Sequence, residues 1–247
     1  MISPPLIAEQ FAPLQHLPGG TTALTAAGDL TVGVHADGQP AGWPLLHDGR
    51  ARHATLVGDA GSGKTELLRS VLLAARAAGV DAAVIDVQQD VLSGLGFPTA
   101  VTMTAARRVL AEQYELALFR QATGGGPLQL LVIENLSYLT GDAVIRDLIG
   151  LLAKEAGPAR IAVLAGTQQV RWPVFGRRDS AEATWRLLAQ ELVLMRTSSQ
   201  YIPSLPMLVA EPDELERVPV CFADGSHAAG VGYLPRRSAT PFRAWRA

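Results

Sequence analysis

The octapeptide Gly58 to Thr65, which reads G-D-A-G-S-G-K-T, constrains the fold of this chain more than any other feature. It matches the pattern G-x-x-x-x-G-K-[ST], in which glycines let successive backbone N–H groups turn around an anion. An apolar stretch at residues 54–57 precedes it, and a stretch of helical periodicity at residues 65–78 follows. The motif therefore predicts a strand, a tight loop and a helix whose positive dipole end faces a phosphate group.

We expect this loop to bind the phosphates of ATP. In such a loop the lysine, Lys64, reaches the β- and γ-phosphates, and the hydroxyl of Thr65 binds Mg²⁺. A chain of this composition would contain the pattern by chance in roughly one case in 500, so a chance match is a weak explanation. The expected nucleotide-binding residues are Gly58, Asp59, Ala60, Gly61, Ser62, Gly63, Lys64 and Thr65.

A carboxylate for the metal site is expected where the apolar run 128–133 ends, at Glu134. P-loop enzymes use such a group on a neighbouring strand to hold the magnesium shell, although a merely structural acid at a strand end is the competing interpretation. Asn135 follows at the position where motor ATPases of this class usually place a carboxylate that polarises the attacking water. An amide is a much weaker base, so we expect hydrolysis to be slow or to need help.

A fourth polar candidate, Gln168, ends the apolar strand expected at residues 161–165 and continued by residues 166 and 167. Its neutral amide is suited to sensing the γ-phosphate or orienting water, and a surface glutamine is the alternative. The expected catalytic residues are Lys64, Glu134, Asn135 and Gln168; the expected metal-binding residues are Thr65 and Glu134.

Apolar and helical stretches alternate from residue 54 onward, which predicts an α/β fold with a mainly parallel sheet covered by helices. Residues 22–46 contain short apolar stretches around an Asp37-Gly38 hairpin signal, so a small antiparallel lead-in is expected there. Residues 1–20 are rich in proline and glycine and predict an extended N-terminal arm. Residues 21–247 are expected to form a single domain.

Composition limits the partners. The 247 residues are 48% hydrophobic and 18% charged with a net charge of −2, so a disordered tail is excluded and any DNA contact must be local. No uninterrupted apolar run approaches the ~20 residues needed to cross a bilayer, and the N-terminus lacks the positive region of a secretory signal. The single cysteine, Cys221, cannot form an intramolecular disulfide, so we expect a cytoplasmic protein with Cys221 as a small buried residue.

Several segments occur in the order that one family uses. Residues 53–58 (H-A-T-L-V-G) look like its approach to the P-loop, residues 131–139 (L-V-I-E-N-L-S-Y-L) stand where it has an acidic run, and residues 166–169 (G-T-Q-Q) resemble its A-T-Q-R segment. Residues 230–233 fit its final hairpin. In this order the segments resemble the FtsK/HerA group of ring-forming P-loop ATPases, which includes DNA translocases and conjugation coupling proteins.

The resemblance implies a RecA-like core, a C-terminal hairpin and a homo-oligomeric, commonly hexameric, ring in which an arginine from a neighbour completes each ATP site. Arg160, Arg171 and Arg196 are the candidates for that arginine. The chain departs from the family pattern at four positions: Glu134 replaces an aspartate, Asn135 a glutamate and Gln169 an arginine. The arginine expected shortly before residue 161 falls at Gly157, which leaves Arg160 as the substitute considered.

The leading hypothesis is therefore an ATPase that moves double-stranded DNA, in plasmid conjugal transfer or DNA segregation. Non-specific contacts to the DNA backbone are expected from arginines of two segments, and a membrane-bound partner is possible. A protein-secretion ATPase or a scaffold of the same superfamily that binds ATP but hydrolyses it slowly is the alternative, and a small-molecule kinase is a remote option. The arginines considered for the backbone are Arg177, Arg178, Arg236, Arg237, Arg243 and Arg246.

Overall fold

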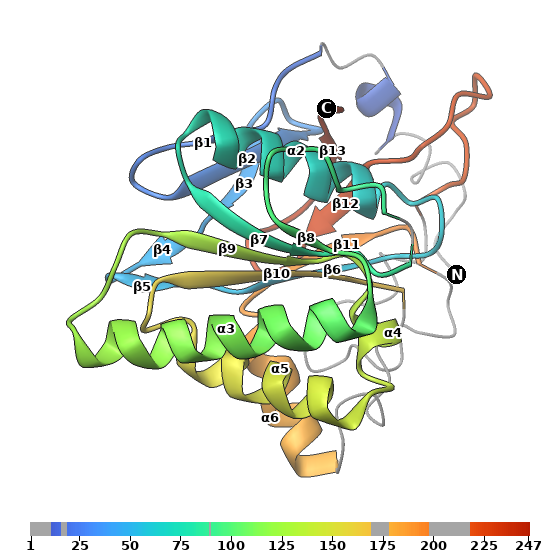
Figure 1. Cartoon of the computed structure of the whole chain (residues 1–247). Helices are drawn as coiled ribbons and strands as arrows, with labels where there is room; N and C mark the ends of the chain where they lie inside the picture. Colours follow the sequence, from blue (N-terminus) through green and yellow to red (C-terminus); the bar gives the residue numbers. More distant parts are fainter. Residues whose placement is uncertain (1–10, 16–18, 89, 169–177, 198–217) are drawn as a thin grey trace.

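The computed structural model describes residues 11–15, 19–88, 90–168, 178–197 and 218–247 (Figure 1). Its centre is a run of six parallel strands. Most of their residues are apolar and buried, because helices cover the sheet from both sides. The P-loop strand β6 is the second strand of this run and lies between β11 and β10. In spatial order the six strands are β11 (Glu191–Met195), β6 (Ala54–Val57), β10 (Ile161–Thr167), β9 (Gln129–Ile133), β7 (Asp81–Ile85) and β8 (Thr99–Ala100).

An antiparallel half extends the same sheet beyond β11. The C-terminal hairpin pairs with β11, and the N-terminal lead-in pairs with that hairpin, so the two ends of the chain complete one continuous sheet. The strands are β12 (Val231–Leu234), β13 (Ser238–Ala244), β2 (Asp29–His35), β1 (Ala23–Leu24) and β3 (Pro40–Pro44). A separate two-stranded hairpin, β4 (Leu46–His47) and β5 (Arg50–Ala51), precedes β6.

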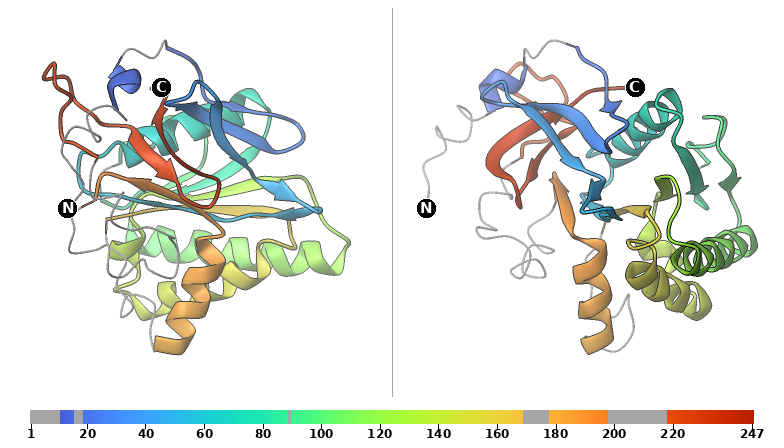
Figure 2. Two further views of the ribbon diagram at one scale, coloured as in Figure 1. Left: turned by 180° about the vertical axis from the view of Figure 1, so that it is seen from behind. Right: turned by 90° about the vertical axis from the view of Figure 1, so that its left-hand side faces the viewer.

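Helices cover the two faces of the sheet unequally. Helix α2 (Lys64–Ala77) packs on one face, whereas α3 (Met103–Ala122), α5 (Ala143–Glu155) and α6 (Arg178–Leu188) lie on the other (Figures 1 and 2). Two apolar cores result, one on each side of the strands. The short helix α4 (Leu136–Leu139) follows β9 directly.

The expected α/β fold, with a mainly parallel sheet, an antiparallel lead-in and a C-terminal hairpin, is confirmed. The Asp37-Gly38 turn joins β2 to β3 as the dipeptide predicts. Three elements were not predicted, β8, α4 and the β4–β5 hairpin, because runs of two to four residues are too short to show a period. The hairpin has its own signal, Asp48-Gly49, where both residues adopt positive φ (49° and 73°), as a tight turn of this kind requires.

Two further expectations differ from the structure. Within the proposed N-terminal arm, residues 11–15 are helical and bury Phe11 and Leu14 in the core, so this part is neither extended nor confined to the surface. Cys221 is exposed and not buried, because it lies beside a turn and pairs through an isolated bridge with His227. Among the helices that the structure describes, none combines the length and the apolar character needed to span a bilayer.

Candidate functional site

The P-loop connects the carboxyl end of β6 to the first turn of α2. Gly61 and Gly63 adopt positive φ (71° and 101°), a region that side chains disfavour. A Cβ on Gly58 would lie 2.6 Å from Ser62 Oγ, and one on Gly63 would lie 2.7 Å from the backbone nitrogen of Gly230. The glycines are therefore required by the loop's conformation and by its close packing.

The side chain of Lys64 is buried and turned into the loop. Its Nζ donates hydrogen bonds to the carbonyl oxygens of Gly58 (2.7 Å) and Asp59 (2.9 Å). Burial lowers the pKa of Lys64 to about 8, although the carboxylates of Glu134 and Asp59 oppose this shift. Phosphate oxygens can replace these two carbonyls as acceptors, and their negative charge would favour the protonated lysine.

Thr65 and Glu134 are in direct contact. The hydroxyl of Thr65 donates to Glu134 Oε1 at 2.7 Å, and Glu134 is only 6% exposed. The two residues come from different elements: Thr65 from the first turn of α2, and Glu134 from the end of β9, two strands away from β6. A hydroxyl and a carboxylate at this spacing form an oxygen-ligand pair of the kind that Mg²⁺ uses together with substrate phosphates.

A cavity of about 430 Å³ opens at this edge of the sheet. This lies within the ~300–1,000 Å³ typical of small-molecule sites. Beneath the loop, Ser62 Oγ is buried and has no hydrogen-bond partner among the described residues. The cavity is lined by Ala60, Gly61, Gly63, Lys64, Thr65, Glu66, Arg69, Val91, Glu134, Gln168 and Ala229.

Known proteins share this fold and a part of this sequence. Residues 39–93 match the model of the type IV secretion-system coupling protein DNA-binding domain. The fold matches a pCW3 conjugation coupling protein TcpA with ATPγS (TM-score 0.71, 16% identity, 89% of this chain and 66% of that chain). It also matches the cytoplasmic domain of the Thermomonospora curvata type VII secretion ATPase EccC (TM-score 0.65, 16% identity, 96% of this chain and 32% of that chain).

A third match is VirB4 of Thermoanaerobacter pseudethanolicus (TM-score 0.54, 9% identity, 91% of this chain and 98% of that chain). No curated protein sequence matches the chain. The chain therefore shares the fold of these P-loop ATPases. It spans less than two thirds of the length of the TcpA and EccC chains, so those proteins contain more than this core.

Asn135 occupies a different environment from the one that its sequence position predicts for a catalytic residue. Its side chain is the N-cap of α4: Oδ1 accepts hydrogen bonds from Tyr138 N (3.3 Å) and Ser137 Oγ (2.9 Å), and Nδ2 donates to Gln88 Oε1. Both ends of the amide are thus engaged by protein groups. Asn135 is also absent from the residues that line the cavity.

Gln168 does line the cavity, at the end of β10 beside β6. Sequence reasoning therefore placed Lys64, Thr65, Glu134 and Gln168 in one site. It missed Arg69, which lies one helical turn after Thr65 and whose position follows from the i, i+4 spacing. It also missed Ala229, which no local pattern signals because the C-terminal segment reaches the loop only in the folded chain.

The arginines considered for action on a neighbouring subunit lie in different places. Arg196 contacts the P-loop of its own chain, because its Nη2 donates to Ala60 O (2.8 Å) and its carbonyl accepts from Asp59 N (2.7 Å). Arg160 precedes β10 at the opposite edge of the sheet, with its Nε buried and lacking a hydrogen-bond partner among the described residues. Gln169, Arg171 and Arg177 lie outside the described residues, and for Arg178 only the backbone is described.

Proposed function

We propose that this chain is an ATPase that binds Mg·ATP in the P-loop cavity. The observation that carries the proposal is the hydrogen bond between Thr65 and Glu134 beside the buried Lys64, at the carboxyl ends of the parallel strands β6 and β9. Ligands of α/β proteins bind at this edge of the sheet. The residues present fit a triphosphate and its metal, since the loop supplies N–H donors and the cation of Lys64, while Thr65 and Glu134 supply oxygen atoms for the metal site.

The roles of the residues follow from these contacts. Lys64 would exchange the carbonyls of Gly58 and Asp59 for β- and γ-phosphate oxygens. Thr65 would bind Mg²⁺ through its hydroxyl, and Glu134 would accept hydrogen bonds from water in the metal's shell. Bound Mg²⁺ would neutralise charge on the phosphates. Gln168, which lines the cavity, would orient a water molecule near the γ-phosphate.

We infer further that hydrolysis is coupled to movement of double-stranded DNA, as in conjugal transfer or DNA segregation. The matches to a coupling-protein domain and to the conjugation coupling protein TcpA support this choice. A homo-oligomeric ring, a cytoplasmic location and a membrane-bound partner belong to the same proposal. Residues 21–247 are proposed to fold as one domain, because strands from both ends of the chain share one sheet.

The test is ATP turnover with and without double-stranded DNA, at low salt because contacts to the DNA backbone weaken steeply with ionic strength. We expect DNA to raise the turnover of the wild-type chain at least several-fold. Particle mass with and without Mg·ATP reports on the ring in the same samples. Turnover that DNA does not change would contradict the coupling to DNA while leaving ATP binding intact.

A second candidate function is an ATP-binding assembly factor of the secretion type that hydrolyses slowly. Two observations favour it. The residue after Glu134 is the amide Asn135 and not a carboxylate that could activate water, and both ends of that amide are engaged by protein groups. Tight ATP binding with no turnover, whether or not DNA is present, would select this function.

A further inference from the structure

A second cavity, of about 270 Å³, lies at the edge of the sheet opposite the P-loop. It is formed where the β4–β5 hairpin meets the amino ends of β6 and β11 and the end of α5. Its volume is on the order of nine times the ~30 Å³ that one water molecule occupies in the liquid. Among the described residues that line it there is no aspartate or glutamate, whereas there are five cations, Arg50, Arg52, Lys154, Arg186 and Arg236.

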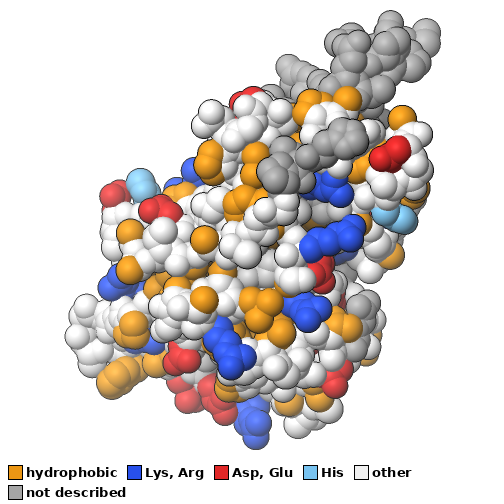
Figure 3. Space-filling model, turned by 90° about the horizontal axis from the view of Figure 1, so that it is seen from above, with side chains coloured by type: hydrophobic (Ala, Val, Ile, Leu, Met, Phe, Trp, Pro, Cys, Tyr) orange, Lys and Arg blue, Asp and Glu red, His pale blue; other side chains and the backbone are white. Residues whose placement is uncertain are grey.

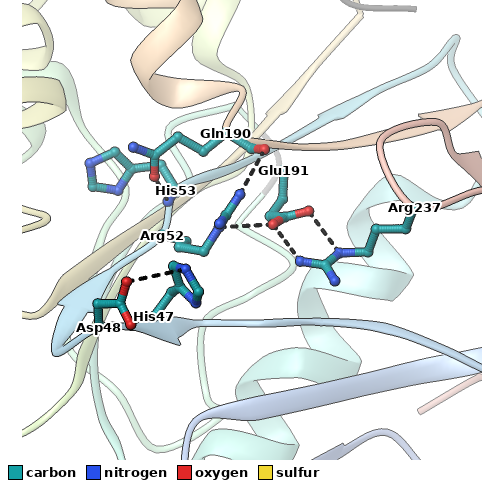
Figure 4. Close-up of polar contacts among 7 residues, drawn as sticks. All are labelled: His47, Asp48, Arg52, His53, Gln190, Glu191 and Arg237. Carbon is teal, nitrogen blue, oxygen red and sulfur yellow. Dashed lines mark hydrogen bonds and ion pairs between the residues drawn. The ribbon is translucent and has the colours of Figure 1, made fainter.

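A buried carboxylate holds two arginines at the back of this cavity. Glu191 is 3% exposed; Arg52 Nε lies 2.8 Å from its Oε1, and Arg237 donates to both of its oxygens (2.6 and 2.9 Å). Figure 4 shows the two guanidinium groups on opposite sides of the carboxylate. The single negative charge of Glu191 therefore pairs with the positive charges of Arg52 and Arg237, and this group of three side chains keeps a net positive charge.

The remaining cations increase that excess. Arg186 pairs with Glu182, but within the described part of the chain Arg50, Lys154 and Arg236 form no ion pair. All three side chains are exposed. Like charges that converge on one hollow repel one another, and an anion bound there would relieve the repulsion.

The local charge stands out against a mixed surface. On the described part of the face in Figure 3, basic, acidic and apolar side chains are interspersed, and the net charge of the whole chain is −2. A surface of this kind gives a polyanion no long-range attraction. Binding would have to take place at a local cluster of cations, and this cavity is one.

We propose that the cavity at the amino edge of the sheet binds phosphate groups of the DNA backbone, an inference that rests on DNA being the polymer of the proposed function. Arginine and lysine side chains bind phosphates without reading bases, which suits a protein that moves along any sequence. Among the described residues that line it, the cavity presents cations and no phenylalanine, tyrosine or tryptophan, so it offers little that would select a peptide. Because ATP would bind at the opposite edge, the two ligands do not compete.

Arg50 and Arg236 are the residues to change, since neither has an ion-pair partner among the residues that the structure describes and neither lines the P-loop cavity. We expect the double variant Arg50→Gln/Arg236→Gln to bind a labelled DNA duplex at least ten-fold more weakly than wild type at low salt, measured by fluorescence anisotropy. The slope of log affinity against log salt should fall by about 2, since each phosphate contact contributes about 0.9. Its ATP turnover without DNA should be unchanged.

The matched control is Arg76→Gln/Arg108→Gln, which also removes two positive charges but from α2 and α3, away from the cavity. It should keep the wild-type slope. If the two double variants lose affinity equally, or if the Arg50/Arg236 variant keeps the wild-type slope, the cavity is refuted as the DNA-binding site. Binding of DNA elsewhere on the chain is not refuted by that result. Displacement of DNA by polyglutamate from wild type as readily as by unlabelled DNA would also overturn it, in favour of an acidic peptide.

A different result would refute the proposed function in DNA movement. A wild-type chain that binds no DNA at low salt would refute DNA as the polymer, and this inference with it. In that case ATP binding, measured in the same preparation, shows whether the P-loop assignment survives.

Discussion

Individual residues determine how far the P-loop implies a working motor. Lys64, Thr65 and Glu134 converge as their sequence positions predict, because the motif fixes the loop and the strand ends fix the carboxylate. Asn135 follows Glu134 in sequence, but its side chain caps α4 and is not among the residues that line the cavity. A missing carboxylate could be read from the sequence, whereas the capping role depends on a four-residue helix that has no sequence signal.

Replacing Asn135 tests that role. Asn135→Asp keeps a good capping oxygen, so its unfolding free energy should match wild type, whereas Asn135→Ala should lose about 1 kcal/mol. Chemical denaturation of both variants measures the difference. In turnover assays the aspartate variant should be the faster enzyme if the missing carboxylate limits hydrolysis. Equal turnover in wild type and Asn135→Asp would show that it does not.

His53 gives the fold a pH dependence. It is buried, its Nδ1 accepts a hydrogen bond from Val163 N (3.1 Å), and burial lowers its pKa to about 4 against the ordinary 6.5, while a hydrogen bond to the Ala153 backbone opposes the shift. Between pH 6.5 and 4 the unfolded chain therefore binds more protons than the folded one, so stability falls as pH falls through this window.

The loss should approach about 3 kcal/mol at the bottom of the window, from ~1.4 kcal/mol per pH unit. Urea midpoints of wild type and His53→Gln at pH 7 and pH 4.5 measure it, with the exposed His47→Gln as control. His53→Gln should show the smaller difference between the two pH values. A difference equal to that of wild type would mean that other groups cause the acid sensitivity.

At the scale of elements, long periodic segments were predictable and short ones were not. Strands β6, β7, β9, β10 and β11 and helices α2, α3 and α5 follow from apolar runs and helical spacing. The pairing of β12 with β11, which lays the C-terminal segment beside the P-loop, has no local signal. Gly230 N nevertheless donates to Ser62 O (2.9 Å), so the hairpin is part of the loop's support.

The junction of β5, β11 and the β12–β13 hairpin depends on Glu191. Removing its charge leaves Arg52 and Arg237 facing each other, so Glu191→Gln should lower the unfolding free energy by about 3 kcal/mol, the low end for a buried pair because both arginines are about one-third exposed. Glu182→Gln, which removes an exposed partner of Arg186, should cost less than about 0.5 kcal/mol. Equal midpoints in denaturant would refute this role of Glu191.

On the scale of the whole molecule, the sheet separates the two cavities that we propose as ligand sites. The carboxyl edge carries the P-loop cavity and the amino edge the basic cavity. The first was predictable because one contiguous motif specifies it. The second was not, because its cations come from the β4–β5 hairpin, α5, α6 and the C-terminal hairpin, and only Arg236 had been considered for DNA.

The central claim is that Lys64 and Thr65 make this chain a binder of Mg·ATP. Calorimetric titration with ATPγS, with and without Mg²⁺, tests it on wild type and Lys64→Met. We expect wild-type binding that tightens with Mg²⁺ and a loss of at least 100-fold in the variant, because the phosphates lose their buried cation. Equal affinity in the two proteins, or binding that Mg²⁺ leaves unchanged, would contradict the account.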